Sequence, residues 1–387
     1  MIASNSDKIQ NHFLIEEMEN LVVQEFVSKE QLNEIKKNNP ATKTNSNILI
    51  RIAFFLLGNF LISSICGFLA LFLSFIDGQN GFGVLFLLAT IGWIFATEFI
   101  YKQNYFAYGF DDSLILSIPI CACISIGIFT EDVIATLFVL VIAASFCSAR
   151  YVHVPSTFFA QIGLVFLIGY SITKKDVIPS AYLPLVLFLL SIMLYFFQKS
   201  ISKNIKYFIY KNVLKSVKIF SLVLGYASLN YYAVRELSEV LLGFHLAPNE
   251  DIPLASLFYF ATFAIPLFYI FYGLKQKDRT FFWIGLLALA LGFATIRYYH
   301  AILPLEIALI SGGSILFVIV YFSIKKIKDK TTGVTFNEDK NLNPMAFDVV
   351  KNLLININVN QTVTTNEDSP MEFGGGGFSG GGSGGNF

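Results

Sequence analysis

Long apolar runs separated by short polar segments fill the middle of this chain. From residue 49 onward there are ten such runs, each close to the roughly 20 residues that cross a hydrocarbon core of about 30 Å. Their expected limits are 50–76, 82–100, 107–129, 132–149, 154–172, 178–198, 217–234, 253–274, 280–298 and 303–324. The pattern predicts an all-α, polytopic membrane protein with about ten transmembrane helices, and nine or eleven remain open.

A polar segment, residues 1–47, precedes the first run. It has no basic start followed by an early apolar stretch, so we expect no cleaved signal peptide. Two short helices are expected here, the second beginning with a capping box formed by Ser28 and Gln31. The first is predicted from a loose helical spacing of Ile9, Phe13, Met18, Leu21 and Val22. This two-helix head is too small to bury its own core, and should pack on the membrane part or on a partner.

The positions of the charges predict which side each loop faces. Six lysines between Lys199 and Lys218 interrupt the apolar sequence, and positive side chains resist crossing the inner membrane, so this segment is expected to be a cytoplasmic loop. The basic segments 275–279 and 325–330 then also lie inside. An even number of spans places both termini in the cytoplasm, with a bacterial inner membrane as the expected location.

Composition agrees with lipid as the main surroundings. Only 14% of the residues are charged, against about 25% in soluble domains. Basic and acidic residues balance at 27 each, so nothing favours nucleic acid as a partner. The four cysteines all lie in apolar runs, where a small buried side chain is the expected role.

The sequence after the last run becomes polar and then repetitive. Residues 325–372 are expected to form a cytoplasmic polar segment with a short amphipathic helix at 345–354. Residues 373–387 contain nine glycines, and such a tail should be disordered when free. Its aromatic side chains are candidates for binding a protein partner: Phe373, Phe378 and Phe387.

Two groups of charged residues near span ends are candidates for chemistry. Glu98, Asp111 and Asp112 are expected at one depth near the inner ends of the second and third spans. They could bind a cation or relay a proton, or be solvated helix ends. Near the outer ends of the ninth and tenth spans, an ion pair between helices and a ligand site are both open for Arg297, His300 and Glu306.

No motif points to a cofactor, a metal or a covalent nucleophile. The sequence contains no phosphate loop, no paired zinc histidines and no nucleophile elbow. The deeper polar residues Asn59, Gln161 and Asn230 are expected to form hydrogen bonds between helices. Pro119 and Pro266 occupy corresponding positions in a five-plus-five division of the spans, but the two halves show no convincing self-similarity.

The N-terminal part resembles a known family. The head "LVVQEFVSKEQLNEIKK" (21–37) is followed closely by the span "ILIRIAFFLLGNFLISSICGFLALF" (48–72). This order is similar to the uncharacterised bacterial multipass proteins grouped under domain of unknown function 2157. The chain departs from them after the first span, where an Asn-Trp pair is expected and Asp77 to Asn80 stand instead. The resemblance implies a membrane protein of unknown role and assigns no site residues.

Three functional hypotheses follow. The first is a non-enzymatic membrane component that recruits a partner at the cytoplasmic face through its head and tail. The second is a transporter of a small solute or ion, suggested by the span number and the carboxylates at one depth. The third is an outward-facing membrane enzyme using Glu236 with Arg297, His300 and Glu306.

Overall fold

The structure is a computed structural model that describes residues 6–23, 27–45, 47–175, 179–242 and 251–299, with isolated positions between 307 and 328. In these ranges the fold is all-α, and a single β-bridge joins Lys43 to Tyr105. Within the same ranges, seven helices are long and apolar enough to cross a membrane, or eight if one bent pair counts as a span. The chain is therefore a multipass membrane protein.

The head folds as the local sequence predicts. Its helices are α1 (Ser6–Val23) and α2 (Lys29–Asn38). The capping box is confirmed: the Gln31 backbone N–H donates to Ser28 Oγ at 3.2 Å, and the Ser28 N–H donates to Gln31 Oε1 at 3.0 Å. Four of the five apolar residues that predicted α1 are buried, namely Ile9, Phe13, Met18 and Leu21.

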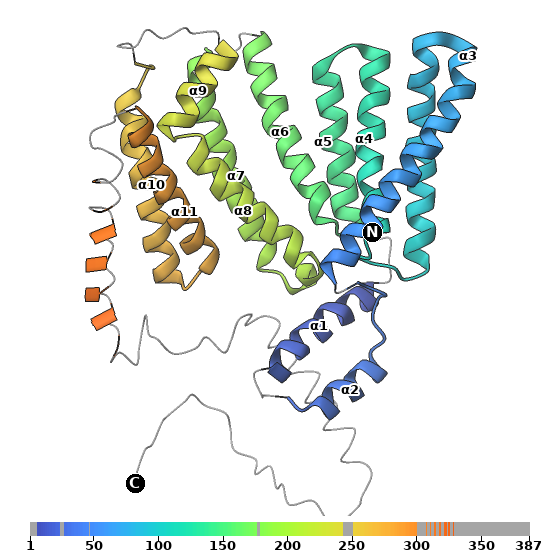
Figure 1. The fold of residues 1–387 in the computed structure, drawn as a ribbon, viewed down its shortest axis with the longest axis horizontal. Helices are drawn as coiled ribbons and strands as arrows, with labels where there is room; N and C mark the ends of the chain where they lie inside the picture. The colour runs from blue at the N-terminus through green and yellow to red at the C-terminus, as the bar shows by residue number, and fades with distance from the viewer. Residues whose placement is uncertain are drawn as a thin grey trace, which may run out of the picture. The chain divides into compact units, whose positions relative to one another are not determined.

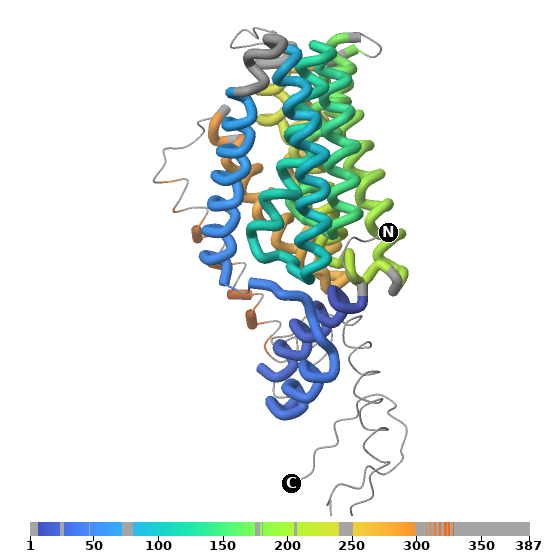
Figure 2. Tube along the Cα trace, turned by 90° about the vertical axis from the view of Figure 1, so that its right-hand side faces the viewer, coloured from blue at the N-terminus to red at the C-terminus, as the bar shows by residue number. Residues whose placement is uncertain are grey.

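The apolar face of the head packs against the membrane domain. Phe13 meets Phe106 and Phe208 edge to face, with ring centroids 6.2 and 6.4 Å apart. Phe208 belongs to η2 (Ile205–Tyr210), a 3₁₀ helix next to α1. Lys211 Nζ lies 4.7 Å above the Phe13 ring. Both views show the head beside the helix ends of the membrane domain (Figures 1 and 2), so packing on the membrane part, one of two predicted outcomes, is confirmed.

The first half of the membrane domain is a series of antiparallel neighbours. Helix α3 (Ile48–Lys102) has two apolar arms, Ile48–Leu71 and Asn80–Lys102, and turns back on itself between them (Figure 1). The next three helices follow through short connections and contact one another in order: α4 (Phe110–Thr130), α5 (Val133–Tyr151) and α6 (Val154–Lys175). These helices correspond to the first five expected runs, with limits shifted by a few residues.

Helix α8 (Lys211–Ala227) packs against both the first half of the membrane domain, α3 to α6, and the rest of the second half. It contacts α6 from the first half and α7, α10 and α11 from the second. The elements of the second half are η1 (Ser180–Tyr182), α7 (Leu183–Ser202), α8 (Lys211–Ala227), α9 (Tyr231–Leu242), α10 (Ala255–Gln276) and α11 (Arg279–Tyr299).

The predicted loop between Lys199 and Lys218 is much shorter in the structure than expected. Helix α7 runs to Ser202 and α8 begins at Lys211, so most of the six lysines lie on helices rather than in a loop. Long lysine side chains explain this, because they reach polar partners from a helix end. Lys211 pairs with Glu16 of α1 at 3.6 Å, and Lys218 pairs with Asp278 from the turn between α10 and α11.

The seventh expected span, 217–234, is not a straight helix. Helix α8 ends at Ala227, and α9 continues at an angle of 75°. The ninth expected span corresponds to α11, whose apolar part is shorter than the other candidates. The tenth expected span, the helix at 345–354 and the tail lie wholly or largely outside the described residues. Ten spans are therefore not reached within the part of the chain that the structure describes.

Candidate functional site

The first turn of α4 holds a buried carboxylate, Asp111. Gly109 precedes α4 with a φ of 113°, and the backbone N–H groups of Tyr108 and Gly109 each donate to Asp111 Oδ1 at 2.9 Å. Asp111 is only 1% exposed, and its second oxygen, Oδ2, is buried without a hydrogen-bond partner. An unpaired polar atom in such a place is uncommon in folded proteins and calls for an explanation.

Asp112 links three separate segments. Arg51, from the first arm of α3, places both Nε and Nη2 at 2.7 Å from Asp112 Oδ2. His153, between α5 and α6, places Nε2 at 3.2 Å from Asp112 Oδ1. Arg51, Asp111, Asp112 and His153 are called the charge cluster below. Because two of its members come from outside α4, the cluster ties the ends of α3 and α6 to the start of α4.

The His153 ring is held from both sides. The backbone N–H of Ser156 donates to His153 Nδ1 at 3.3 Å, and Ser156 Oγ lies 2.8 Å from the same nitrogen. On the other side of the ring, Nε2 is buried and lies 3.2 Å from Asp112 Oδ1, outside hydrogen-bond geometry. The ring is thus fixed between the start of α6 and Asp112.

Glu98 has a partner of its own. Its Oε1 accepts from Arg150 Nε at 2.6 Å and from the Tyr151 hydroxyl at 3.2 Å. The Tyr101 hydroxyl donates to the Tyr151 carbonyl at 3.2 Å, which joins this ion pair to the same end of α3. Among the described residues, no three His, Cys, Asp or Glu side chains form a group that could hold a metal ion.

Sequence reasoning placed the carboxylates but missed the histidine. Glu98, Asp111 and Asp112 do lie at one end of neighbouring helices, as predicted, yet two of them face arginines instead of one another. His153 lies in the short gap between two expected spans, beside Arg150 and Tyr151. This gap contains a basic, an aromatic and an imidazole side chain, and it lies on the same predicted side of the membrane as the three carboxylates. That combination was the signal that could have identified His153.

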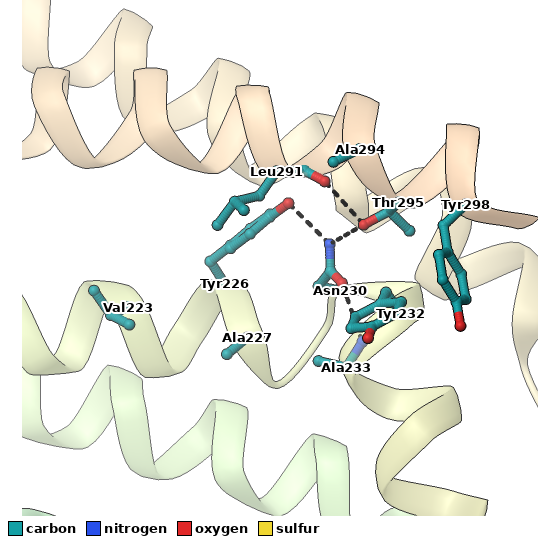
Figure 3. Close-up of a pocket in the computed structure, with 10 residues that line it drawn as sticks. All are labelled: Val223, Tyr226, Ala227, Asn230, Tyr232, Ala233, Leu291, Ala294, Thr295 and Tyr298. Atoms are coloured by element: carbon teal, nitrogen blue, oxygen red, sulfur yellow. Dashed lines mark hydrogen bonds between the residues drawn. The ribbon is translucent and has the colours of Figure 1, made fainter. Parts of the chain in front are cut away.

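A second polar site lies where α8 breaks. Asn230 Oδ1 accepts the backbone N–H of Ala233 at 3.1 Å, which caps the start of α9. The Tyr231 N–H donates to Thr262 Oγ1 of α10 at 3.0 Å. Asn230 Nδ2 donates to the hydroxyls of Tyr226 at 2.8 Å and Thr295 at 3.3 Å (Figure 3). The predicted interhelical hydrogen bonding of Asn230 is thus confirmed, with α11 as the other helix.

The two other deep polar residues behave differently. Asn59 donates to the Phe55 carbonyl of its own helix at 3.0 Å, so this bond is not between helices. Gln161 is buried, and neither its oxygen nor its nitrogen has a hydrogen-bond partner. The prediction of interhelical hydrogen bonds is therefore wrong for these two residues.

A cavity of about 370 Å³ accompanies the break. Tyr226, Asn230 and Thr295 supply converging polar groups, Tyr232 and Tyr298 add two more hydroxyls, and the rest of the lining is apolar with no charged residue (Figure 3). Tyr232 and Tyr298, which lie edge to face at 5.3 Å, are both exposed at this wall. A mostly apolar cavity with a few convergent polar groups is typical of a small-molecule site.

The outward candidates lie mostly outside the part of the chain that the structure describes. Arg297 is exposed near the end of α11, next to Tyr298 of the cavity wall. His300 and Glu306 lie outside the described residues, as do Phe373, Phe378 and Phe387. Whether these residues form a site stays a prediction.

No family model, curated protein or solved structure matches the chain. The class that the fold defines is that of a multipass helical membrane protein.

Proposed function

We propose that this chain is a transporter of a small solute, and that the solute binds in the cavity at the break between α8 and α9. The observation that carries the proposal is an interrupted apolar span in which Asn230, at the break, lines a cavity. Non-helical backbone at membrane depth is tolerated where it is buried in protein or lines a cavity. Transporters place their substrate sites at such broken helices.

The cavity wall suggests the class of solute. The absence of charge from its lining favours an uncharged, mainly apolar molecule, since a charged one would enter without a partner. Tyr226 accepts a hydrogen bond from Asn230, and that bond leaves the phenol hydrogen available. The solute should therefore carry a hydrogen-bond acceptor such as a carbonyl. A molecule of this kind dissolves in the bilayer and can enter from the side.

We expect Tyr226→Phe to abolish solute binding. Acetophenone carries the acceptor and should raise the melting temperature of the protein in lipid nanodiscs by several degrees. Cumene has nearly the same shape without a carbonyl and should raise it little. In cells that express the chain, the level of Nile red, an uncharged apolar carbonyl dye, should differ from the level in cells without it, and Tyr226→Phe should remove that difference.

Tyr269→Phe is the matched control. Its hydroxyl donates to the Leu222 carbonyl at 3.2 Å, away from the break, so this variant should retain both the acetophenone shift and the altered dye level. Equal shifts with acetophenone and cumene, or unchanged binding in Tyr226→Phe, would contradict the assignment of the cavity.

We propose that the end of the membrane domain beside the head is cytoplasmic, in a bacterial inner membrane. Support comes from the basic residues that gather there. Lys211 pairs with the head, and Lys218 pairs with the turn before α11. Positive side chains collect on the cytoplasmic side, and both termini then face the cytoplasm if the span number is even.

Recruitment of a protein partner is the second candidate function. The observation that favours it is the folded head, in which α2 buries Leu32 and Ile35 and exposes a polar face that includes Lys29, Asn33 and Lys37. A small polar helix presented at a membrane surface is a suitable contact for another protein, and the Gly-rich tail would add a second contact.

Loss of the tail aromatic residues should release such a partner. We expect Phe373, Phe378 and Phe387 changed together to serine to leave insertion intact, and to reduce the amount of a co-purified protein at least tenfold, measured by quantitative mass spectrometry. Removal of residues 373–387 should have the same effect. An unchanged set of co-purified proteins in both variants would contradict this function.

A further inference from the structure

The charge cluster holds two carboxylates beside one permanently positive side chain, Arg51. The Arg51 contacts go to Asp112 Oδ2 at 2.7 Å, and the nearest His153 nitrogen lies 3.2 Å from Asp112 Oδ1. An ionised Asp111 would therefore hold a buried charge on an oxygen, Oδ2, that no hydrogen-bond donor reaches. Such a charge is unfavourable near the hydrocarbon region.

The favourable contacts are divided unequally between the two aspartates. Arg51 makes both of its short contacts to Asp112, at 2.7 Å, and His153 faces Asp112 as well. Asp111 receives only backbone N–H groups, and these reach Oδ1 alone. Its Oδ2 is buried and unpaired. A proton bound there neutralises the buried carboxylate without breaking any hydrogen bond.

The groups around Asp111 support this position for the proton. Arg51 and Tyr101 on α3, Asp112 on α4, and His153 at the junction of α5 and α6 all interact electrostatically with Asp111. Asp112 repels a second negative charge. A proton on His153 Nδ1 would displace the Ser156 N–H, whereas a proton on Asp111 displaces nothing.

We infer that the charge cluster is a proton-binding site, and that Asp111 Oδ2 takes up one proton from the adjacent aqueous face. Uptake converts a buried carboxylate into a neutral carboxylic acid. This inference deepens the proposed function by naming the proton as the coupling ion. Its test needs no solute, so its failure is distinguishable from failure of the cavity assignment.

Infrared spectroscopy tests the protonated state directly. At neutral pH exposed carboxyl groups are ionised, so a carbonyl stretch of a carboxylic acid reports a buried, protonated side chain. We expect this band in the unaltered protein in nanodiscs and its loss in Asp111→Asn. Asp132→Asn is the matched control, because Asp132 is exposed and caps α5 through Oδ1 at 3.0 Å, a bond that asparagine retains.

The pH dependence of stability gives a second readout. A folded state that holds a proton which the unfolded chain releases becomes less stable as pH rises. The melting temperature of the unaltered protein should therefore fall as pH rises above the ordinary aspartate range of about 4. It should stay level in Asp111→Asn, where the amide imitates the neutral acid.

Three outcomes would overturn the inference. These are a missing carbonyl band in the unaltered protein, a band retained in Asp111→Asn, and a pH response lost in His153→Gln but kept in Asp111→Asn. The last would place the proton on the imidazole. If Asp111→Asn does not fold, the band and its shift in Asp111→Glu decide the question, since a longer acid changes the frequency while an unrelated group would leave it unaltered.

Discussion

Gly109→Ala is expected to destabilise the membrane domain by about 3 kcal/mol or more. Gly109 has a φ of 113°, a conformation that side-chain-bearing residues rarely adopt, and a Cβ placed there would lie 2.3 Å from the Arg51 carbonyl oxygen. Backbone strain alone costs about 1–3 kcal/mol. The clash adds to it, because both atoms belong to or adjoin rigid backbone.

This change acts on the charge cluster as well as on the fold. The Gly109 N–H is one of the two donors to Asp111, and the Arg51 side chain forms the ion pair with Asp112. Moving the two backbones apart lengthens both sets of contacts together. Equilibrium unfolding in nanodiscs, followed by tryptophan fluorescence, measures the effect.

Gly92→Ala is the control for Gly109→Ala. Gly92 lies within α3, and a Cβ there meets no atom within 4 Å. We expect a change within about 0.5 kcal/mol, as for exposed positions without special contacts. Equal destabilisation by both variants would show that any added methyl group is unfavourable in this part of the protein, and that the close approach at Arg51 is unimportant.

The apolar spans were predictable because lipid imposes a strong requirement on length. The expected limits 107–129 and 132–149 differ by only a few residues from α4 and α5. The start of α2 was predictable for a local reason, since the capping box depends on residues three positions apart. Both features can be read without knowing which helices touch.

The break at Asn230 could not be predicted in the same way. Asparagine near small residues such as Ala227 and Ser228 is equally compatible with a straight, closely packed helix. The bend between α8 and α9 depends on Thr262 and Thr295, which reach the break from two other helices. The pairing of His153 with Asp112 likewise requires that the α5–α6 junction lie beside the start of α4. Sequence alone does not specify these neighbours.

Arg51→Gln is expected to destabilise the protein by about 3 kcal/mol, more than Asp112→Asn does. The reason is the unequal exposure of the two partners. The Asp112 side chain is 9% exposed and the Arg51 side chain 37%. Removal of the arginine leaves a buried carboxylate that only His153 still faces, whereas removal of the carboxylate leaves a cation whose long side chain can reach water.

A double-mutant cycle separates this pair from its surroundings. Combined Arg51→Gln and Asp112→Asn should be less destabilising than Arg51→Gln alone, because no buried charge then lacks a partner. Arg150→Gln is the matched control: its pair with Glu98 is more exposed on the acidic side, at 21%, and should contribute about 1 kcal/mol or less. Additive losses in the double variant would mean that Arg51 stabilises the helix end independently of Asp112. The charge cluster would then not be the contact that ties α3 to α4.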